Sequence, residues 1–115
     1  MTPGTPAGAL VDLEHVDLLT LLQALSDPVR LEIVRQLAAC PCPGEMACGQ
    51  IKLSVSKSTV THHMRVLLDA GVVSEREAGT RKFMALRREE LDERFPGVLD
   101  SVIRTAGAPH AAAAV

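Results

Sequence analysis

The chain has 115 residues, of which 47% are hydrophobic and 23% are charged. This length is that of one domain and the composition is that of a globular protein, so a wholly disordered chain is excluded. No apolar run approaches the roughly 18–20 residues that a membrane helix needs. The chain has two phenylalanines and neither tryptophan nor tyrosine, so it lacks the aromatic platforms with which single-strand-binding proteins stack bases.

The net charge is −2, but the charges are unevenly distributed along the chain. Residues 57–88 contain seven basic and three acidic residues, which gives them a net charge of +4, and the rest of the chain carries −6. A basic segment in an acidic frame is a candidate contact surface for an anionic polymer. On charge alone, a solvated polar surface is the simpler interpretation.

The ends of the chain differ in composition from its middle. Residues 1–11 are rich in proline and glycine and residues 107–115 are rich in alanine, so a flexible lead-in and a flexible tail are predicted. The lead-in has no basic segment, and no secretory signal is expected there. Residues 12–106 are predicted to form one domain, mainly helical with a small β-hairpin and therefore of the α+β class.

Two helices are predicted in the first third of this domain. Leucines cover more than one face of residues 12–25, which predicts a helix with one side in the core and another against a partner subunit. Asp27 as N-cap and Pro28 at the first helical position predict a second helix that continues to about Ala39.

The strongest helical pattern follows a short segment at residues 46–53. Ser56 is predicted to be the N-cap of this helix and Gly71 the glycine just after its end. Val60, Met64 and Leu67 form its apolar stripe. The stripe predicts that the opposite side of the helix faces solvent.

The last third of the domain is predicted to contain a hairpin and a broken helix. A strand begins at residues 72–73, the turn lies at residues 77–80, and the return strand covers residues 82–86. A last helix is expected from near Arg88, with an interruption at residues 96–97. Its second part carries apolar residues on one side, namely Val98, Leu99, Val102 and Ile103.

Two helices joined by a tight turn and followed by a glycine-tipped hairpin are typical of a winged helix-turn-helix domain. Two motifs are more specific: ALSDPVRLEIV at residues 24–34, and SKSTVTHHMRVL at residues 56–67, which AGVV follows at residues 70–73. Together they resemble the ArsR/SmtB family of bacterial repressors over about residues 12–106. The resemblance implies a homodimer that binds double-stranded operator DNA. We expect its subunits to meet through their first and last helices, away from any membrane.

The resemblance also implies which residues contact DNA. By position, the family's DNA-contacting face falls on eight residues: Lys57, Ser58, Thr59, Thr61, His62 and Arg65 on the helix, and Arg81 and Lys82 on the hairpin. Short hydroxyls near a helix N-terminus can reach base edges and phosphates, and long cations suit phosphates or the minor groove. The simpler alternatives are capping roles for the first hydroxyls and a solvated hairpin for the last two cations. His63 flanks the apolar stripe and is predicted to be packed.

The chain departs from the family pattern in the first helix of the helix-turn-helix motif and in its metal-site positions. Ile51 and Leu53 are two residues apart instead of one helical turn, and Ser54 stands where the family has a turn glycine. We therefore expect a shortened or irregular third helix, with Ser54 in a strained turn conformation. The family's metal site on the last helix needs histidine, and residues 88–106 contain none.

The three cysteines, Cys40, Cys42 and Cys48, are expected to be free thiols in a reducing cytoplasm. The interpretation we favour is that they are inert small residues. The alternatives are a three-thiolate site for arsenite or another thiophilic ion, and a disulfide that forms on oxidation. No cofactor is expected unless this thiol site binds a metal ion.

The sequence thus predicts a DNA-binding transcriptional regulator, a repressor released from its operator by a signal that remains unidentified. The chain has no phosphate-binding glycine loop, metalloprotease motif or nucleophile elbow, and no enzymatic activity is predicted. Two alternatives remain: a dimeric winged-helix module that binds proteins but not DNA, and a repressor that senses metal or oxidant through its thiols.

Overall fold

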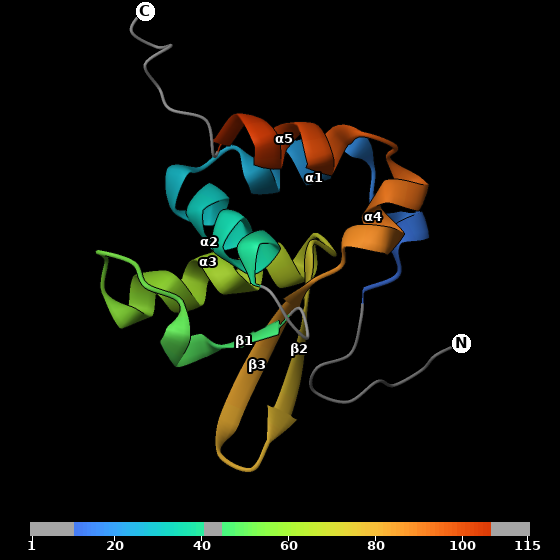
Figure 1. The fold of residues 1–115 in the computed structure, drawn as a ribbon. Helices are drawn as coiled ribbons and strands as arrows, with labels where there is room; N and C mark the ends of the chain where they lie inside the picture. The colour runs from blue at the N-terminus through green and yellow to red at the C-terminus, as the bar shows by residue number, and fades with distance from the viewer. Residues whose placement is uncertain (1–10, 41–44, 107–115) are drawn as a thin grey trace, which may run out of the picture.

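Helices lie on one side of a small antiparallel sheet, and a β-hairpin projects from the body of the molecule (Figure 1). The structure is a computed structural model that describes residues 11–40 and 45–106. The elements in chain order are the 3₁₀ turn η1 (Leu13–His15), helices α1 (Leu18–Leu25) and α2 (Pro28–Ala39), strand β1 (Glu45–Ala47), the 3₁₀ turn η2 (Cys48–Gln50), helix α3 (Lys57–Asp69), strands β2 (Val73–Ala78) and β3 (Arg81–Leu86), and helices α4 (Arg88–Arg94) and α5 (Val98–Ala106). The predicted α+β winged-helix class is confirmed. None of these described helices is long and apolar enough to cross a membrane.

The N-terminal region is two elements where one helix was predicted. An Asp12 carboxylate oxygen accepts a hydrogen bond from the Glu14 amide at 3.0 Å and caps η1. An Asp17 carboxylate oxygen accepts one from the Thr20 amide at 2.8 Å and caps α1. Val16 between them is extended, with ψ at 124°. The prediction of one helix over residues 12–25 was wrong because two side-chain caps start two separate elements.

The predicted limits of α2 and α3 are confirmed. Asp27 Oδ2 accepts from the amides of Val29 and Arg30 at 2.8 and 3.1 Å, and Pro28 occupies the first turn of α2. Ser56 Oγ accepts from the Thr59 amide at 3.3 Å at the start of α3. Gly71, with φ at +76°, follows its end and turns the chain toward β2.

The segment between α2 and α3 is irregular, as predicted: η2 is a single 3₁₀ turn. The expected strain at Ser54 was wrong, because no described residue other than glycine has a positive φ. The side-chain amide of Gln36 on α2 donates to the Lys52 carbonyl at 2.8 Å and accepts from the Lys52 amide at 3.0 Å. This pair of hydrogen bonds shapes the loop, so a left-handed turn residue is not required.

The sheet has three strands, in the order β1-β3-β2, all antiparallel. The predicted hairpin is present, with β2 continuing to Ala78 and a two-residue turn at Gly79 and Thr80. Gly79 has φ at +65°, which suits the first position of such a turn. The sequence analysis missed β1, whose three residues pair with β3 so that Met46 lies opposite Met84.

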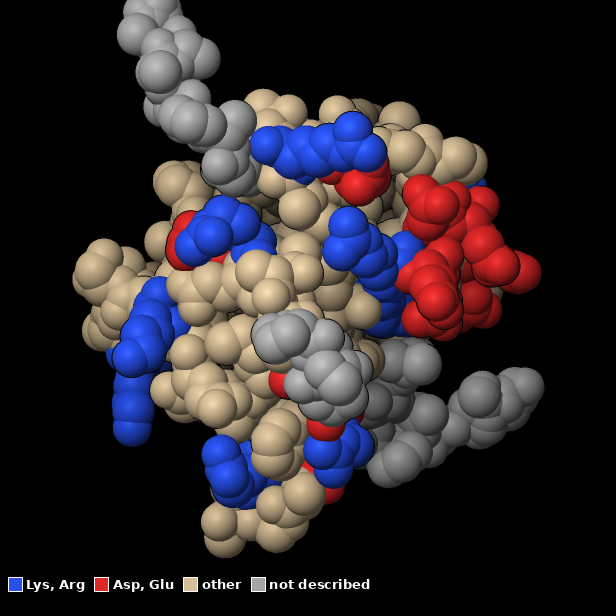
Figure 2. Space-filling model, in the orientation of Figure 1, with Lys and Arg blue, Asp and Glu red and all other residues tan. Residues whose placement is uncertain are grey.

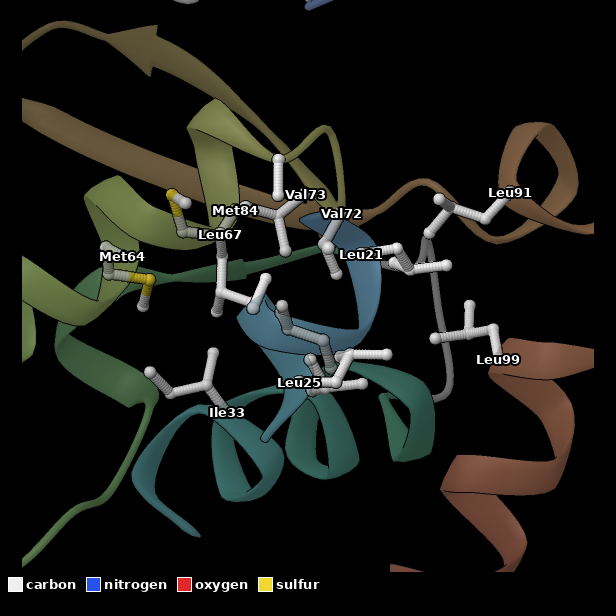
Figure 3. Packing of buried hydrophobic residues seen from close by; sticks show 14 of the residues in the cluster. Leu21, Leu25, Ile33, Met64, Leu67, Val72, Val73, Met84, Leu91 and Leu99 are labelled. Atoms are coloured by element: carbon white, nitrogen blue, oxygen red, sulfur yellow. The ribbon is translucent and has the colours of Figure 1, made fainter. Parts of the chain in front are cut away.

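The core is almost entirely aliphatic and is formed by residues of all the helices together with the sheet (Figure 3). Its fully buried side chains are Leu21, Ile33, Val34, Leu67, Val72, Val73, Met84, Leu91 and Leu99. Leu99 of α5 was expected to contribute to an intersubunit face, and this expectation was wrong because α5 packs on α2 and buries it within the subunit. The core also fixes the inner side of α3, so its outer side faces solvent.

Candidate DNA-binding face

The outer side of α3 gathers most of the predicted DNA-contacting residues. Met64 and Leu67 on its inner side are buried. The exposed residues of the helix include Lys57, Ser58, Thr61, His62 and Arg65. Thr59 is half-buried and lies between the two sides. The structure therefore leaves five of the six predicted helix residues exposed to solvent.

Hydroxyl groups at the start of α3 bond to one another. Ser56 Oγ lies 2.9 Å from Thr59 Oγ1 and 3.2 Å from Ser58 Oγ. Thr61 Oγ1 donates to the Lys57 carbonyl at 3.0 Å. Thr59 thus takes part in capping, whereas the exposed hydroxyls of Ser58 and Thr61 can exchange these exposed contacts for a ligand.

The wing, defined as β2, β3 and their turn, carries the other two predicted cations. Arg81 and Lys82 are both exposed, and Lys82 Nζ lies 3.7 Å from Glu75 Oε2. The Arg81 guanidinium lies 5.3 Å from the centre of the Phe83 ring, which supports its long side chain. Arg81 has no carboxylate partner among the described residues. It is therefore available to an external anion.

Arg76 belongs to the same basic segment but is tied to strand β1. Its guanidinium donates to both carboxylate oxygens of Glu45, with Nε 3.3 Å from Oε2, and lies 4.6 Å from the centre of the Phe83 ring. The hydrogen bond from Arg76 lowers the pKa of the Glu45 carboxyl below its ordinary value. Arg76 therefore links strands β2 and β1 within the sheet. The sequence analysis had not distinguished it from the other basic residues of the wing.

The largest group of acidic side chains lies at one edge of the face in Figure 2, whereas basic side chains are spread over that face. Lys and Arg side chains appear beside the start of α3 and around the wing, and acidic side chains gather over α4. The acidic residues of α4 are Glu89, Glu90, Asp92 and Glu93. Because four acidic residues of the chain are gathered on α4, a chain of net charge −2 can still expose basic side chains beside α3 and on the wing.

Lys52 is a candidate that the sequence analysis missed. It is exposed on the loop that leads into α3, and the Gln36 amide holds its backbone on both sides. Glu32 Oε2 accepts from Gln36 Nε2 at 2.8 Å and orients that amide. The signal available in the sequence was a lysine in the turn of the helix-turn-helix motif.

The thiols remain largely outside what the structure describes. Cys40 is half-buried and its Sγ donates to the Glu45 carbonyl at 3.3 Å. Cys42 lies outside the described residues, and the side chain of Cys48 is not described either. Among the residues that are described, no three His, Cys, Asp or Glu side chains are grouped to hold a metal ion. The thiol hypothesis stays a prediction.

Comparison with known proteins identifies the family. Residues 25–76 match the model of a helix-turn-helix domain. An arsenical resistance operon repressor of Staphylococcus xylosus is 38% identical over 82 residues, which are 70% of this chain and 75% of that protein. The uncharacterized HTH-type transcriptional regulator YceK of Bacillus subtilis is 31% identical over 84 residues, 71% of this chain and 82% of that protein. The chain belongs to the ArsR family.

The fold of this ArsR-family chain agrees with that assignment. It superposes on the crystal structure of an ArsR family transcriptional regulator with a TM-score of 0.59 and 16% identity, covering 88% of this chain and 100% of that chain. The prediction of a DNA-binding transcriptional regulator is confirmed, and a module that binds only proteins is not favoured. Membership of this family points to a regulator and not to an enzyme.

Proposed function

We propose that this ArsR-family chain is a homodimeric repressor that reads operator DNA with α3 and contacts the flanking backbone with its wing. The observation that carries the proposal is the exposed polar side of α3, whose opposite side is anchored in the core. A rigid helix with short polar side chains at its N-terminal half fits a major groove about 12 Å wide.

The roles within α3 follow from side-chain length and position. Ser58, Thr61 and His62 reach base edges, because they are compact and lie on the outer side of the first two turns. Lys57 and Arg65 reach phosphates on either side. Arg65 Nε lies 3.6 Å from Asp69 Oδ1, and this exposed ion pair is weak enough to be exchanged for a phosphate contact.

Thr59 completes the proposed site on α3, where its amide and hydroxyl bond to the N-cap Ser56, and it stays close to the phosphate backbone. On the wing, Arg81 and Lys82 contact phosphates or the minor groove. Lys52 adds a phosphate contact from the loop before α3. These cations make binding depend on salt, and the compact side chains of α3 make it depend on sequence.

The dimer is proposed from α1 and α5. Leu18, Leu19 and Leu22 of α1 are 44%, 68% and 40% exposed, although leucine favours burial. Beside them is a groove that Leu25, Leu31 and Val102 help to line, so apolar surface continues from α1 to α5. A second copy that covers this surface removes the cost of hydrating it, about 25 cal/mol for each Å².

Repression and location complete the proposal. Relatives from Staphylococcus xylosus and Staphylococcus aureus, 38% and 35% identical, bear the name arsenical resistance operon repressor. By this similarity we assign repression to the present chain, with release by a signal. The cytoplasm, which holds operator DNA, is the compartment that this role requires.

Selection of bound sequences from random duplex DNA tests the proposal. The full chain should enrich an inverted repeat whose half-sites lie about one helical turn, ~34 Å, apart. The affinity should fall with salt, with log K decreasing by ~0.9 per log unit of salt for each phosphate neutralised. Binding without enrichment of any sequence, or no binding to duplex DNA, would contradict it.

A further inference from the structure

One side chain, Arg30 near the start of α2, joins three helices. Its Nε donates to the Ala24 carbonyl at 2.6 Å and its Nη2 donates to the Gln23 carbonyl at 3.2 Å, both in the last turn of α1. Its Nη1 lies 3.0 Å from Nδ1 of His63 on α3. Arg30 therefore connects the end of α1 directly to α3, the helix proposed to read the operator.

The chemistry of these groups fixes the direction of each hydrogen bond. A guanidinium has donors only, so His63 Nδ1 accepts from Arg30 and the hydrogen of the neutral ring is on Nε2. The last carbonyls of a helix carry partial negative charge, which suits a cation, and the Gln23 carbonyl also accepts from the amide of the C-cap Ser26. The planar fork of arginine can serve both sites at once, which the single ammonium of lysine cannot.

Asp27 adds a negative charge to the same cluster. Its Oδ2 caps α2 and lies 3.7 Å from His63 Nδ1. Burial alone raises the pKa of the Asp27 carboxyl, but the hydrogen bonds from the amides of Arg30 and Val29 and the positive charge of Arg30 outweigh it, so the net shift is downward. The His63 side chain is only 12% exposed. The prediction that His63 is packed against the body of the molecule is confirmed.

We propose that Arg30 and His63 are positioning residues for operator recognition, whose contact sets the rotation of α3 relative to α1. The apolar anchors of α3, Met64 and Leu67, are not directional, whereas a hydrogen bond to a ring nitrogen is. His62, a proposed base reader, precedes His63, and the two rings lie 5.1 Å apart between centroids. A rotation that displaces His63 also displaces His62.

A misplaced α3 should weaken operator binding more in a dimer than in a monomer. Two copies of α3 must enter successive major grooves at one fixed spacing, so an error in the placement of α3 on α1 affects both half-sites. Binding sites are held in geometry by such supporting contacts. This inference rests on the proposed function, because it needs α3 to read bases.

A matched pair of variants at residue 63 tests the inference. His63→Leu keeps apolar bulk but removes the acceptor, whereas His63→Asn places an amide oxygen where it can accept from Arg30. We expect His63→Leu to lose about tenfold in affinity for the selected operator and to keep its affinity for random duplex within about twofold, which changes their ratio by roughly 1.4 kcal/mol. His63→Asn should restore most of that ratio. The melting temperature of each variant is measured alongside.

Arg30→Lys is the second arm, used where His63→Leu does not fold. It keeps the positive charge but cannot hold both α1 and His63, so it should also lose the preference for the operator. The inference is overturned if the folded variants keep the wild-type ratio, if they lose affinity for both duplexes equally, or if His63→Asn behaves like His63→Leu. Wild-type protein that shows no sequence preference contradicts the proposed function instead.

Discussion

At the scale of single residues, whether an arginine can contact phosphate depends on the carboxylate with which it is already paired. Arg76 is held by Glu45 and Arg65 lies beside Asp69, whereas Arg81 has no carboxylate partner among the described residues. Exposed ion pairs contribute at most about 1 kcal/mol, so those on the proposed DNA-binding surface can be exchanged for phosphate at little cost. Arg81 would not have to break an ion pair to contact phosphate. The effect of replacing it is therefore the simplest to interpret among the wing residues.

Arg81→Ala should weaken binding to all duplex sequences by a similar factor and reduce the salt slope by about one phosphate. Thr61→Ala and His62→Ala should instead change which sequences are preferred, because these side chains are proposed to contact base edges. Binding to the selected operator and to a scrambled duplex at several salt concentrations measures both effects. A loss of preference in Arg81→Ala equal to that in His62→Ala would show that the wing reads sequence.

Asp27 should contribute to stability through its cap and through its charge. Asp27→Ala is expected to lower the free energy of unfolding by about 1 kcal/mol, and Asp27→Asn by less, since asparagine also caps helices. The pKa of the native carboxyl lies below its ordinary value. The advantage of wild type over Asp27→Asn should therefore be complete above pH ~4, the unfolded pKa, and disappear as the pH falls through the lower native pKa. Urea unfolding at pH 7 and at pH 3 measures it, and an advantage independent of pH would contradict the ionic part.

The thiols give a prediction that separates the inert interpretation from sensing. We expect wild-type protein to stay on its operator in arsenite, zinc or peroxide, because free cysteines in proteins commonly act as small apolar residues. Gel-shift titration with each reagent measures release. Release that Cys48→Ser abolishes, with DNA binding intact, would instead establish a thiol sensor.

At the scale of elements, short local signals determine where the helices begin and end. Asp12, Asp17, Asp27 and Ser56 each accept a hydrogen bond from an amide of the following turn. The end of α3 depends on Gly71, which is buried as well as left-handed. A β-carbon there would collide with the side chain of Leu13 in η1. Gly71 therefore fixes both the end of α3 and the approach of the N-terminal segment.

Gly71→Ala and Gly79→Ala form a matched pair for this element. Both glycines have positive φ, at +76° and +65°, so each alanine should cost about 1–2 kcal/mol of backbone strain. Gly79 has open space around it, but at residue 71 Leu13 must also move, which should add about 1–3 kcal/mol. Urea unfolding of the two variants measures the difference. Equal losses of unfolding free energy in the two variants would mean that the Leu13 side chain moves away without cost.

At the scale of the whole molecule, the proposed DNA contacts, the acidic cluster and the exposed leucines lie on different elements. Basic side chains lie beside the start of α3 and on the wing, the largest acidic cluster lies over α4, and Leu18, Leu19 and Leu22 are exposed on α1 (Figures 1 and 2). A monomer would leave those leucines in water. Two copies joined through α1 and α5 would cover them and leave both basic faces free, which is the arrangement that an inverted repeat requires.

Leu19→Glu should convert the dimer to a monomer, because it places a charge in the centre of the proposed contact. Val55→Glu is the control, since Val55 is also an exposed apolar residue, at 36%, but lies on the loop before α3. Analytical ultracentrifugation at micromolar concentration should show dimers for the wild type and for Val55→Glu. A stable wild-type monomer would refute the interface.

Much of this architecture could be predicted from sequence because it depends on neighbours in the chain. The Asp27-Pro28 start of α2, the Ser56 and Gly71 limits of α3 and the glycine turn of the wing all depend on interactions within a few residues. The apolar stripe of α3 also has local periodicity, and so its solvent-facing side could be identified. Local patterns do not decide which residues on the solvent-facing side of α3 contact DNA, or whether the thiols sense a signal. Both points stay predictions.

The remaining features were decided only by tertiary contacts. Strand β1 exists because it pairs with β3, with Glu45 opposite Ala85, and its three residues carry no pattern of their own. Gln36 shapes the loop at Lys52, 16 residues away, and Arg30 meets His63 across 33 residues. Periodicity and capping report which residues turn inward or begin a helix, but a hydrogen bond between distant side chains depends on how whole helices pack. The sequence alone therefore determined the limits of α2 and α3, the hairpin and the exposed side of α3, and the packing determined strand β1 and the contacts that hold α3 in place.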